Sequence, residues 1–277
     1  MNTALDYEKI ATLYDSYCRF TDDIPFFLQI CQGSSAVLEL TCGTGRLSVP
    51  LLQAGVPLTC VDISPAMLAV LRQKLTAARL SAPVVQADIT CLPLVPGQSW
   101  VLLPFHSFHE LPSAAARQQA LREAARVLQP DGRLVVTLHN PAVRPRSLQQ
   151  GPMTYGPFSR LDGEGAVSVT SDLTCVGAGR TVSGWQTVRE LDAAGQTIAE
   201  HRLAVRFSLI ELDPLQALLK SAGFKPEAIF GDYSGSSFEP ETSPYIIVDA
   251  RKEATEATVT SLPPAGRAQD AKHEPQT

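Results

Sequence analysis

The sequence has no long basic run and no apolar stretch long enough to span a membrane. It contains 23 lysines and arginines against 28 aspartates and glutamates, which gives a formal net charge of -5. Proteins that bind nucleic acid usually carry a basic patch, so we expect no nucleic-acid partner. A membrane helix needs roughly 20 apolar residues, and a signal peptide needs a basic and then an apolar segment. The sequence offers neither, and we expect a soluble, cytoplasmic protein with no membrane partner.

The sequence also lacks closely spaced cysteine pairs. Its six cysteines show no C-x-x-C spacing, so no zinc or redox motif is indicated and no metal site is expected. Small, buried, reduced side chains are the ordinary use of such cysteines. Binding of arsenic or another metalloid by a set of thiolates is the alternative.

Short apolar segments alternate with helical ones over the first half of the chain. We expect strands at 36–41, 58–62, 84–88, 99–104 and 133–139, with helices at 45–54, 65–78 and 114–128 between them. Strands of this kind, separated by helices, form a mostly parallel, doubly wound sheet with helices on both faces, an α/β fold. Ligands of such sheets bind beyond the carboxyl ends of the strands.

The pattern changes after Pro141. Segments 166–176, 181–191 and 197–209 are rich in β-formers and separated by glycine-containing turns, which predicts an antiparallel β insertion. The expected organisation is an N-terminal helical cap (1–35), a core in two pieces (36–140 and 211–251), the insertion (141–210) and a disordered tail (252–277).

Polar residues and glycines follow the first three expected strands. Glu39 and the turn Cys42-Gly43-Thr44-Gly45 belong to the first strand, Asp62 to the second and Asp88 to the third. Glycine lets the backbone approach a ligand closely, and carboxylates can accept hydrogen bonds from ribose hydroxyls and an adenine amine. Ile63, Met67 and Ile89 can supply apolar surface for a flat ring. Together these residues predict an adenosine pocket.

Two alternatives remain for this set of residues. A NAD-binding fold also has an acid about 20 residues after its glycines. Its G-x-G-x-x-G fingerprint would require glycine where Ser48 stands, so the signal for NAD is weak. In the second alternative, the glycines form a plain tight turn and the acids only cap helices or end loops.

The segments "VLELTCGTGR", "VDISPAML", "VVQADI" and "LREAARVLQPDGRLVV" resemble motifs of the class I S-adenosylmethionine-dependent methyltransferases. The resemblance covers 24–139, and "LLKSAGFKPEAIFGDYSG" resembles a later helix and strand of that family. The insertion is similar to the lid sheet of small-molecule N-methyltransferases of the glycine/sarcosine and amino-sugar types. The resemblance implies a Rossmann-like methyltransferase core with S-adenosyl-L-methionine as cofactor and a small-molecule methyl acceptor.

The resemblance also assigns residues. The positions implied to face the methionine part are Glu39, Thr41, Gly43 and Gly45, and we also expect Cys42 and Thr44 of the same turn to bind the cofactor. Asp62 would hold the ribose, Asp88 and Ile89 the adenine, and Pro104 and Phe105 would flank the sulfonium. Thr41 departs from the pattern, where glycine is usual. N-terminal tyrosines close over the cofactor in similar enzymes, and Tyr14 is assigned that role here, with Tyr17 as the alternative.

Methyl transfer requires mainly alignment of acceptor, carbon and sulfur, and a general base only when the acceptor arrives protonated. The candidate bases are His109 in "HSFHEL" and His139 at the end of the fifth strand, with His106 as a weaker one. We therefore predict a methyltransferase (EC 2.1.1 class) that acts on N, O or S of a small molecule, as a monomer or homodimer. The alternatives are a non-catalytic sensor or scaffold that binds S-adenosylmethionine, and a NAD-dependent oxidoreductase.

Overall fold

The computed structural model describes residues 7–148, 151–161, 163–177 and 180–253 of the 277-residue chain. The first six residues of the expected cap and almost all of the expected tail, from 254 onward, lie outside the described residues. No helix in the described part is both long and apolar enough to cross a membrane.

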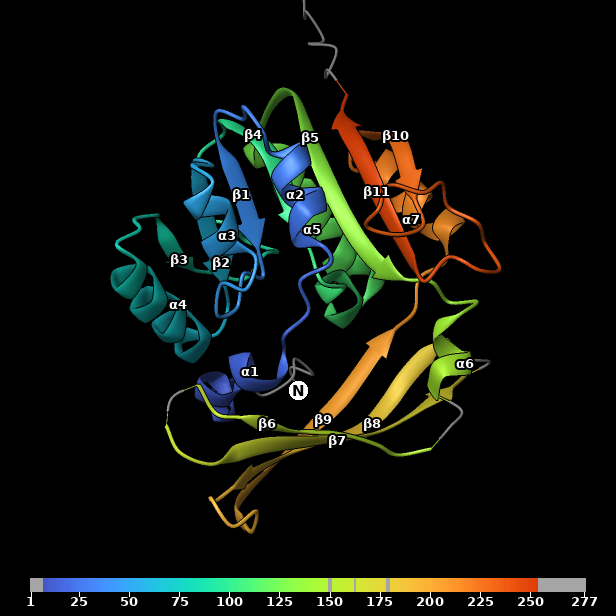
Figure 1. Cartoon of the computed structure of the whole chain (residues 1–277). Coiled ribbons are helices and arrows are strands. Elements are labelled where there is room, and N and C mark those ends of the chain that lie inside the picture. Colours follow the sequence, from blue (N-terminus) through green and yellow to red (C-terminus); the bar gives the residue numbers. More distant parts are fainter. Residues whose placement is uncertain (1–6, 149–150, 162, 178–179, 254–277) are drawn as a thin grey trace, which may run out of the picture.

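A seven-stranded sheet forms the centre of the molecule, in the order β10-β11-β5-β4-β1-β2-β3 (Figure 1). Its strands are β1 (Val37–Leu40), β2 (Leu58–Asp62), β3 (Val84–Gln86), β4 (Gln98–Leu103), β5 (Leu128–His139), β10 (Phe224–Phe230) and β11 (Tyr245–Lys252). All run parallel except β11, which is antiparallel to both of its neighbours. The predicted doubly wound, mostly parallel sheet is confirmed.

Helices cover both faces of this sheet because successive strand residues point to opposite sides. Val37 packs with α2 (Ile24–Ile30), α3 (Ser48–Gln53) and α4 (Pro65–Ala78). Leu38 packs on the other face with α5 (Ala114–Val127) and α7 (Leu212–Ser221). Helix α4 begins where the sequence predicts, since the Ser64 hydroxyl accepts the Met67 amide at 3.2 Å and Pro65 occupies the first turn.

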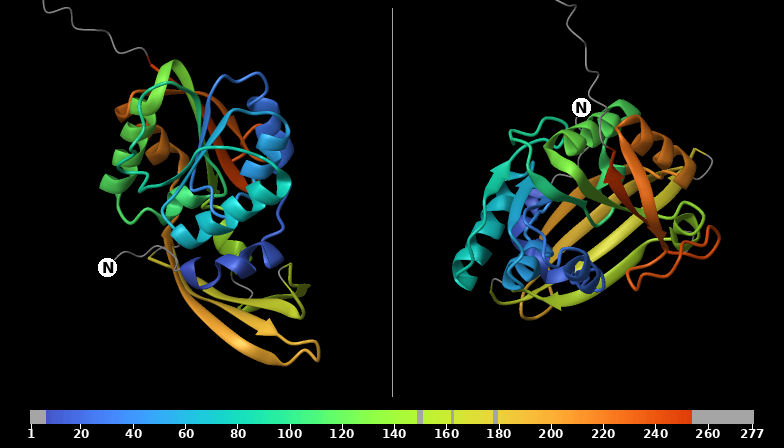
Figure 2. Two further views of the ribbon diagram at one scale, coloured as in Figure 1. Left: turned by 90° about the vertical axis from the view of Figure 1, so that its left-hand side faces the viewer. Right: turned by 90° about the horizontal axis from the view of Figure 1, so that it is seen from above.

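A second, antiparallel sheet lies beyond the carboxyl ends of the parallel strands (Figures 1 and 2). Its order is β6-β7-β8-β9, with bounds Met153–Ser159, Ala166–Val176, Thr181–Leu191 and Thr197–Ser208. The sequence predicts the last three strands. It does not predict β6, nor α6 (Arg144–Leu148). The strand expected at 84–88 ends early, at Gln86, so Asp88 lies in the following loop.

The N-terminal segment lies between the second sheet and the α4 side of the main sheet (Figure 1). It consists of η1 (Tyr7–Lys9) and α1 (Ala11–Tyr17). Ile10 and Leu13 are fully or nearly fully buried against Val167 and Leu203 of the second sheet. The apolar side of this segment therefore faces the second sheet, and its polar residues are left to meet the main sheet.

The orientation of the charged residues of β8 and β9 follows from their register. Leu203 faces the N-terminal helix and pairs with Gln186, so Trp185 and Arg202 point the other way. Arg202 lies over the Trp185 ring, 4.2 Å from its centroid, and Arg189 bonds Glu200 on that same outer face. These arginines form an outward charged face, whereas His201 points inward and pairs with Glu190.

Candidate functional site

The polar strand ends meet at the carboxyl edge of the main sheet, where the strand order reverses between β1 and β4. Such a reversal is where parallel sheets bind ligands. The turn after β1 carries Gly43 at φ +54° and Gly45 at φ +83°, which residues with a side chain rarely adopt. A Cβ on Gly45 would collide with Leu71 of α4, so this glycine permits close packing. A Cβ on Gly43 would approach only the Met67 methyl, at 3.8 Å, which leaves its other side open to a ligand.

Asp62 ends β2 beside this turn. Its Oδ2 accepts the Gly43 amide at 2.8 Å, and its Oδ1 accepts the Ser64 amide at 2.9 Å. These bonds fix the orientation of the carboxylate, and each oxygen keeps a further lone pair. Burial raises the pKa of Asp62, against the opposing effect of the backbone hydrogen bonds. The side chain is thus a pre-oriented acceptor next to the glycine turn.

Glu39 lies below the turn. It is 2% exposed, and its Oε2 accepts the Ser48 hydroxyl at 2.6 Å. Burial raises its pKa well above the usual range. Ser48 occupies the position where a NAD fingerprint has its third glycine, and here it hydrogen-bonds Glu39. Both residues therefore brace the base of the turn.

Three residues with side chains have left-handed backbone at this edge. Thr41 has φ 60°, and Phe105 and His106, which follow β4, have φ 53° and 65°. The Thr41 hydroxyl bonds the Leu40 carbonyl at 2.5 Å and so turns away from the open side of the turn. A β-branched residue in this conformation is strained, and such strain gathers at functional sites.

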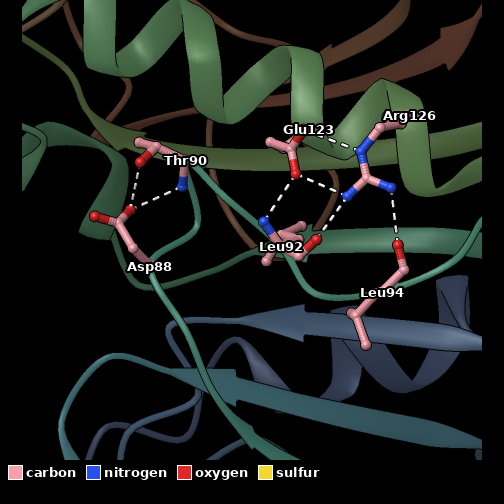
Figure 3. Close-up of polar contacts among 6 residues, drawn as sticks. All are labelled: Asp88, Thr90, Leu92, Leu94, Glu123 and Arg126. Carbon is pink, nitrogen blue, oxygen red and sulfur yellow. Dashed lines mark hydrogen bonds and ion pairs between the residues drawn. The ribbon is translucent and has the colours of Figure 1, made fainter.

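Asp88 and the apolar residues near it lie at the next part of the edge. Figure 3 shows the Asp88 carboxylate turned toward Thr90, whose amide and hydroxyl bond its Oδ1 at 2.8 and 2.7 Å. The other oxygen has no hydrogen-bond partner in the described part of the chain and points away from Thr90. Figure 3 also shows Glu123 and Arg126 of α5 bonding the backbone of the following residues, Leu92 and Leu94.

The residues predicted to contact the adenine ring differ in exposure. Met67 and Ile89 are buried, and Ile63 is 47% exposed. An exposed isoleucine next to Asp62 offers free apolar surface at the edge of the site. The adenine role of Asp88, Ile89 and these neighbours stays a prediction.

The N-terminal segment is fastened to the same edge by polar contacts. Asp15 accepts the Thr44 hydroxyl at 2.6 Å and pairs with Lys74 at 2.8 Å. Glu8 accepts the Ser64 hydroxyl at 2.7 Å. Thr44 belongs to the glycine turn, and Ser64 follows Asp62 by two residues, so the segment lies over the site.

Tyr14 belongs to this segment, and its ring packs against two other tyrosines. Its ring contacts Tyr7 and Tyr17 edge to face, at 5.8 and 5.5 Å between centroids. Burial raises the pKa of Tyr14 well above its usual range. The predicted closing role of Tyr14 stays a prediction, and its ring is packed between those of Tyr7 and Tyr17.

Phe105 is in contact with Arg46, a residue that the sequence analysis did not identify. The Arg46 guanidinium lies 4.4 Å from the Phe105 ring centroid and bonds both oxygens of Asp23 at 2.6 Å. Pro104, before Phe105, is buried. Arg46 directly follows the glycine turn in the "CGTGR" segment, and this position could have identified it from the sequence.

His109 is in a position that argues against the predicted base role. Its Nδ1 lies 2.8 Å from the Ser208 carbonyl, and its Nε2 accepts the His139 amide at 3.0 Å. Burial lowers the pKa of His109 to about 4. Both ring nitrogens are occupied by backbone, so His109 has neither a lone pair nor a proton to exchange with an acceptor, and its geometry is structural.

His139 and His106 are better placed for proton transfer. Their rings stack at 3.9 Å, and His106 also stacks on Tyr245 at 4.9 Å. Burial lowers the pKa of both histidines well below the usual value, so both are neutral near pH 7. Nδ1 of His106 has no partner among the described residues. The base prediction therefore passes to His139, with His106 beside it.

Glu110 is a further residue of the site. It is half-buried, accepts the Tyr7 hydroxyl at 3.2 Å, and burial raises its pKa to about 7. Among the described residues, no group of three or more His, Cys, Asp or Glu side chains is placed to hold a metal. The six cysteines are free thiols, and Cys42 and Cys60 are buried.

Comparisons with known proteins show similarity in sequence and in fold. Residues 37–132 match the methyltransferase domain family. The demethylmenaquinone methyltransferase of Thermus thermophilus is 35% identical over 102 residues, which is 36% of this chain and 45% of that protein. The chain thus spans about half the length of the curated relatives it matches.

Solved structures match over most of the chain. An S-adenosylmethionine-dependent methyltransferase from Clostridium acetobutylicum has a TM-score of 0.75 at 16% identity and covers 90% of this chain and 99% of its own. A sugar N-methyltransferase from Streptoalloteichus has a TM-score of 0.68 at 22% identity, covering 84% and 88%. At such identities the likeness shows the fold, including the second sheet.

Proposed function

We propose that the chain is an S-adenosylmethionine-dependent methyltransferase acting on a small molecule, because residues 37–132 match the methyltransferase domain family and the chain has the fold of the class I methyltransferases. The observation that carries this proposal is the pairing of Asp62 with Gly43. A carboxylate with a fixed orientation lies beside a glycine turn whose outer side is open. Ribose hydroxyls need an acceptor of this kind.

The residues at the edge fit the parts of the cofactor. Asp62 would hold the ribose hydroxyls, Asp88 and Ile89 the adenine, and the turn Thr41–Gly45 the methionine part. Phe105, fixed by Arg46, would lie beside the sulfonium. When bound, the cofactor supplies a methyl group already activated for in-line displacement.

The protein's own contribution is alignment and exclusion of water. The N-terminal segment and the second sheet both lie over the carboxyl edge, which supports a small acceptor rather than a macromolecular one. The acceptor would lie near the stacked rings of His106, His139 and Tyr245. Because burial lowers the pKa of both histidines, both rings are neutral at neutral pH and could accept a hydrogen bond from the acceptor, although the same shift makes each a weaker base. The negative net charge supports a small-molecule acceptor over nucleic acid, and we propose that the enzyme acts in the cytoplasm.

Two measurements on the purified protein test the proposal. Isothermal titration with S-adenosylmethionine and, separately, with NAD should give binding of the first only. Incubation with methyl-labelled cofactor and a metabolite pool, read by mass spectrometry, should then give a product heavier by one methyl group. Binding of NAD alone would reject the proposal. Tight binding of S-adenosylmethionine without transfer to any pool would favour the sensor.

A further inference from the structure

A cavity of about 530 Å³ lies on the far side of the main sheet from α3 and α4, between α5, α7 and the link that joins β9 to α7. Figure 2 shows α5 and α7 side by side on this face. The volume is in the range of small-molecule sites. None of its lining residues belongs to the predicted cofactor site. Its walls are mostly apolar and include Leu209, Ile210 and Leu218.

One wall of the cavity carries a buried, unneutralised charge. Arg117 of α5 is only 9% exposed, and no hydrogen bond or ion pair joins its guanidinium to any other residue in the described part of the chain. Its Nε is buried without a partner. An unpaired buried charge is costly, and proteins normally pair it. The same burial lowers the pKa of Arg117.

The other charged residues of the cavity are already paired with each other. Arg180 and Glu211 form an ion pair at 3.0 Å, and their side chains are 68% and 50% exposed. They therefore lie at the solvent side of the cavity and neutralise one another. Arg117 is left as the interior cation, with apolar side chains around it.

We propose that this cavity binds a small amphiphilic anion, a carboxylate on a short hydrocarbon body, with Arg117 as its counter-ion. The planar guanidinium fork matches a carboxylate with two parallel hydrogen bonds. The apolar walls would take the hydrocarbon body. This site is additional to the proposed methyl transfer and does not depend on it.

The ligand would contact the link between the second sheet and the core. Leu209 and Ile210 follow Ser208, whose carbonyl accepts from His109. The Leu209 amide donates to the Arg180 carbonyl at 2.8 Å, next to the cavity. Occupancy should therefore slow amide hydrogen exchange at Leu209.

The test is isothermal titration of the full-length protein with octanoate, with octanol and inorganic phosphate as comparison probes. Arg117→Met removes the cation and keeps an apolar stem. Arg122→Met is the matched control, because Arg122 is exposed on the same helix and has no partner in the described part of the chain. Octanoate should bind the wild type and Arg122→Met, and should bind Arg117→Met at least about tenfold more weakly, a loss of about 1.4 kcal/mol.

A thermal scan separates this outcome from misfolding. Arg117→Met should melt at or above the wild-type temperature, because it removes an unpaired buried charge. Three results would overturn the proposal: no octanoate binding to the wild type, equal binding by Arg117→Met, or equal binding of octanol or phosphate. A lower melting temperature for Arg117→Met would also count against it, since Arg117 would then have a stabilising role in the fold.

Discussion

Nδ1 of His109 lies 2.8 Å from the carbonyl oxygen of Ser208, and the same ring accepts the His139 amide through Nε2. One buried imidazole thereby joins the last residue of β9 to the carboxyl end of β5. The second sheet and the edge of the main sheet are connected at this point. The protonation state of His109 therefore affects how firmly the two sheets are held together.

Protonation of His109 should destabilise the fold in acid. The folded pKa is about 4 and the unfolded one about 6.5, so below pH ~6.5 the unfolded chain binds a proton that the folded chain does not. The contribution of neutral His109 to the free energy of unfolding is fully present above the unfolded-state pKa. It is lost as the pH falls toward the folded-state pKa, by about 3 kcal/mol in all.

The variant His109→Gln isolates this effect. Urea denaturation of wild type and variant should be followed between pH 4 and pH 7, a range of about three pH units. The difference in stability between the two proteins should shrink toward low pH, because glutamine does not titrate. The other histidines, and the carboxyl groups whose pKa is raised by burial, titrate in both proteins, so their effect on stability cancels in the comparison. Parallel profiles would disprove the linkage. A large loss of kcat with unchanged stability would return the base role to His109.

Asp62→Ala should weaken the binding of S-adenosylmethionine by about 1–3 kcal/mol, the cost of losing hydrogen bonds to a charged acceptor. Isothermal titration measures it, with Asp172→Ala as the control, because Asp172 is an exposed carboxylate of β7 paired with Trp185 on the outer face of the second sheet. An unchanged dissociation constant for Asp62→Ala would remove this residue from the cofactor site.

Thr41→Gly should stabilise the protein, against the usual effect of introducing glycine. The left-handed backbone at φ 60° costs a residue with a side chain about 1–2 kcal/mol, and glycine avoids that cost. Part of the gain is lost to the greater freedom of the unfolded chain, so the net rise should be about 1 kcal/mol.

Chemical denaturation tests this, with Thr59→Gly as the comparison. Thr59 lies in the extended strand β2, where glycine should destabilise. Equal losses of stability in both variants would show that the Thr41 backbone is not strained. Weaker cofactor binding by Thr41→Gly would show that the threonine contributes to binding.

Local signals made much of the fold predictable. Strands β7 and β8 and helix α4 have the predicted bounds, because alternation, glycine turns and the Ser64-Pro65 start are encoded within a few residues. The glycine turn and Asp62 could be placed together because parallel strands end at one edge. Strand β6 was missed, since "MTYGPFS" contains a glycine and a proline and shows no clear alternation.

The contacts that decide residue roles were not predictable in this way. His109 meets a carbonyl 99 positions later in the chain, and Asp15 meets Thr44 across 29 positions. Sequence periodicity carries no information about such pairs, because they depend on how the second sheet and the N-terminal helix dock. The sequence could therefore identify the histidines of the site but not which of them has a free nitrogen.

The ion pair between Arg46 and Asp23, the residue before α2, should be the most sensitive contact between the expected N-terminal cap and the core. Both guanidinium–carboxylate distances are 2.6 Å, Asp23 is fully buried, and Arg46 also donates to the Phe20 carbonyl at 2.8 Å. Asp23→Asn leaves a buried guanidinium without its counter-charge and should cost about 3–5 kcal/mol of stability.

Arg46→Lys keeps the charge but not the planar fork, so it should cost less, about 1–3 kcal/mol. It should also raise the dissociation constant for S-adenosylmethionine, because the Phe105 ring loses the guanidinium that lies over it. Urea denaturation and isothermal titration give the two values, and Arg122→Lys controls for the substitution itself. If Arg46→Lys matched the wild type in both measurements, neither the fork nor its contact with Phe105 would be needed for the site.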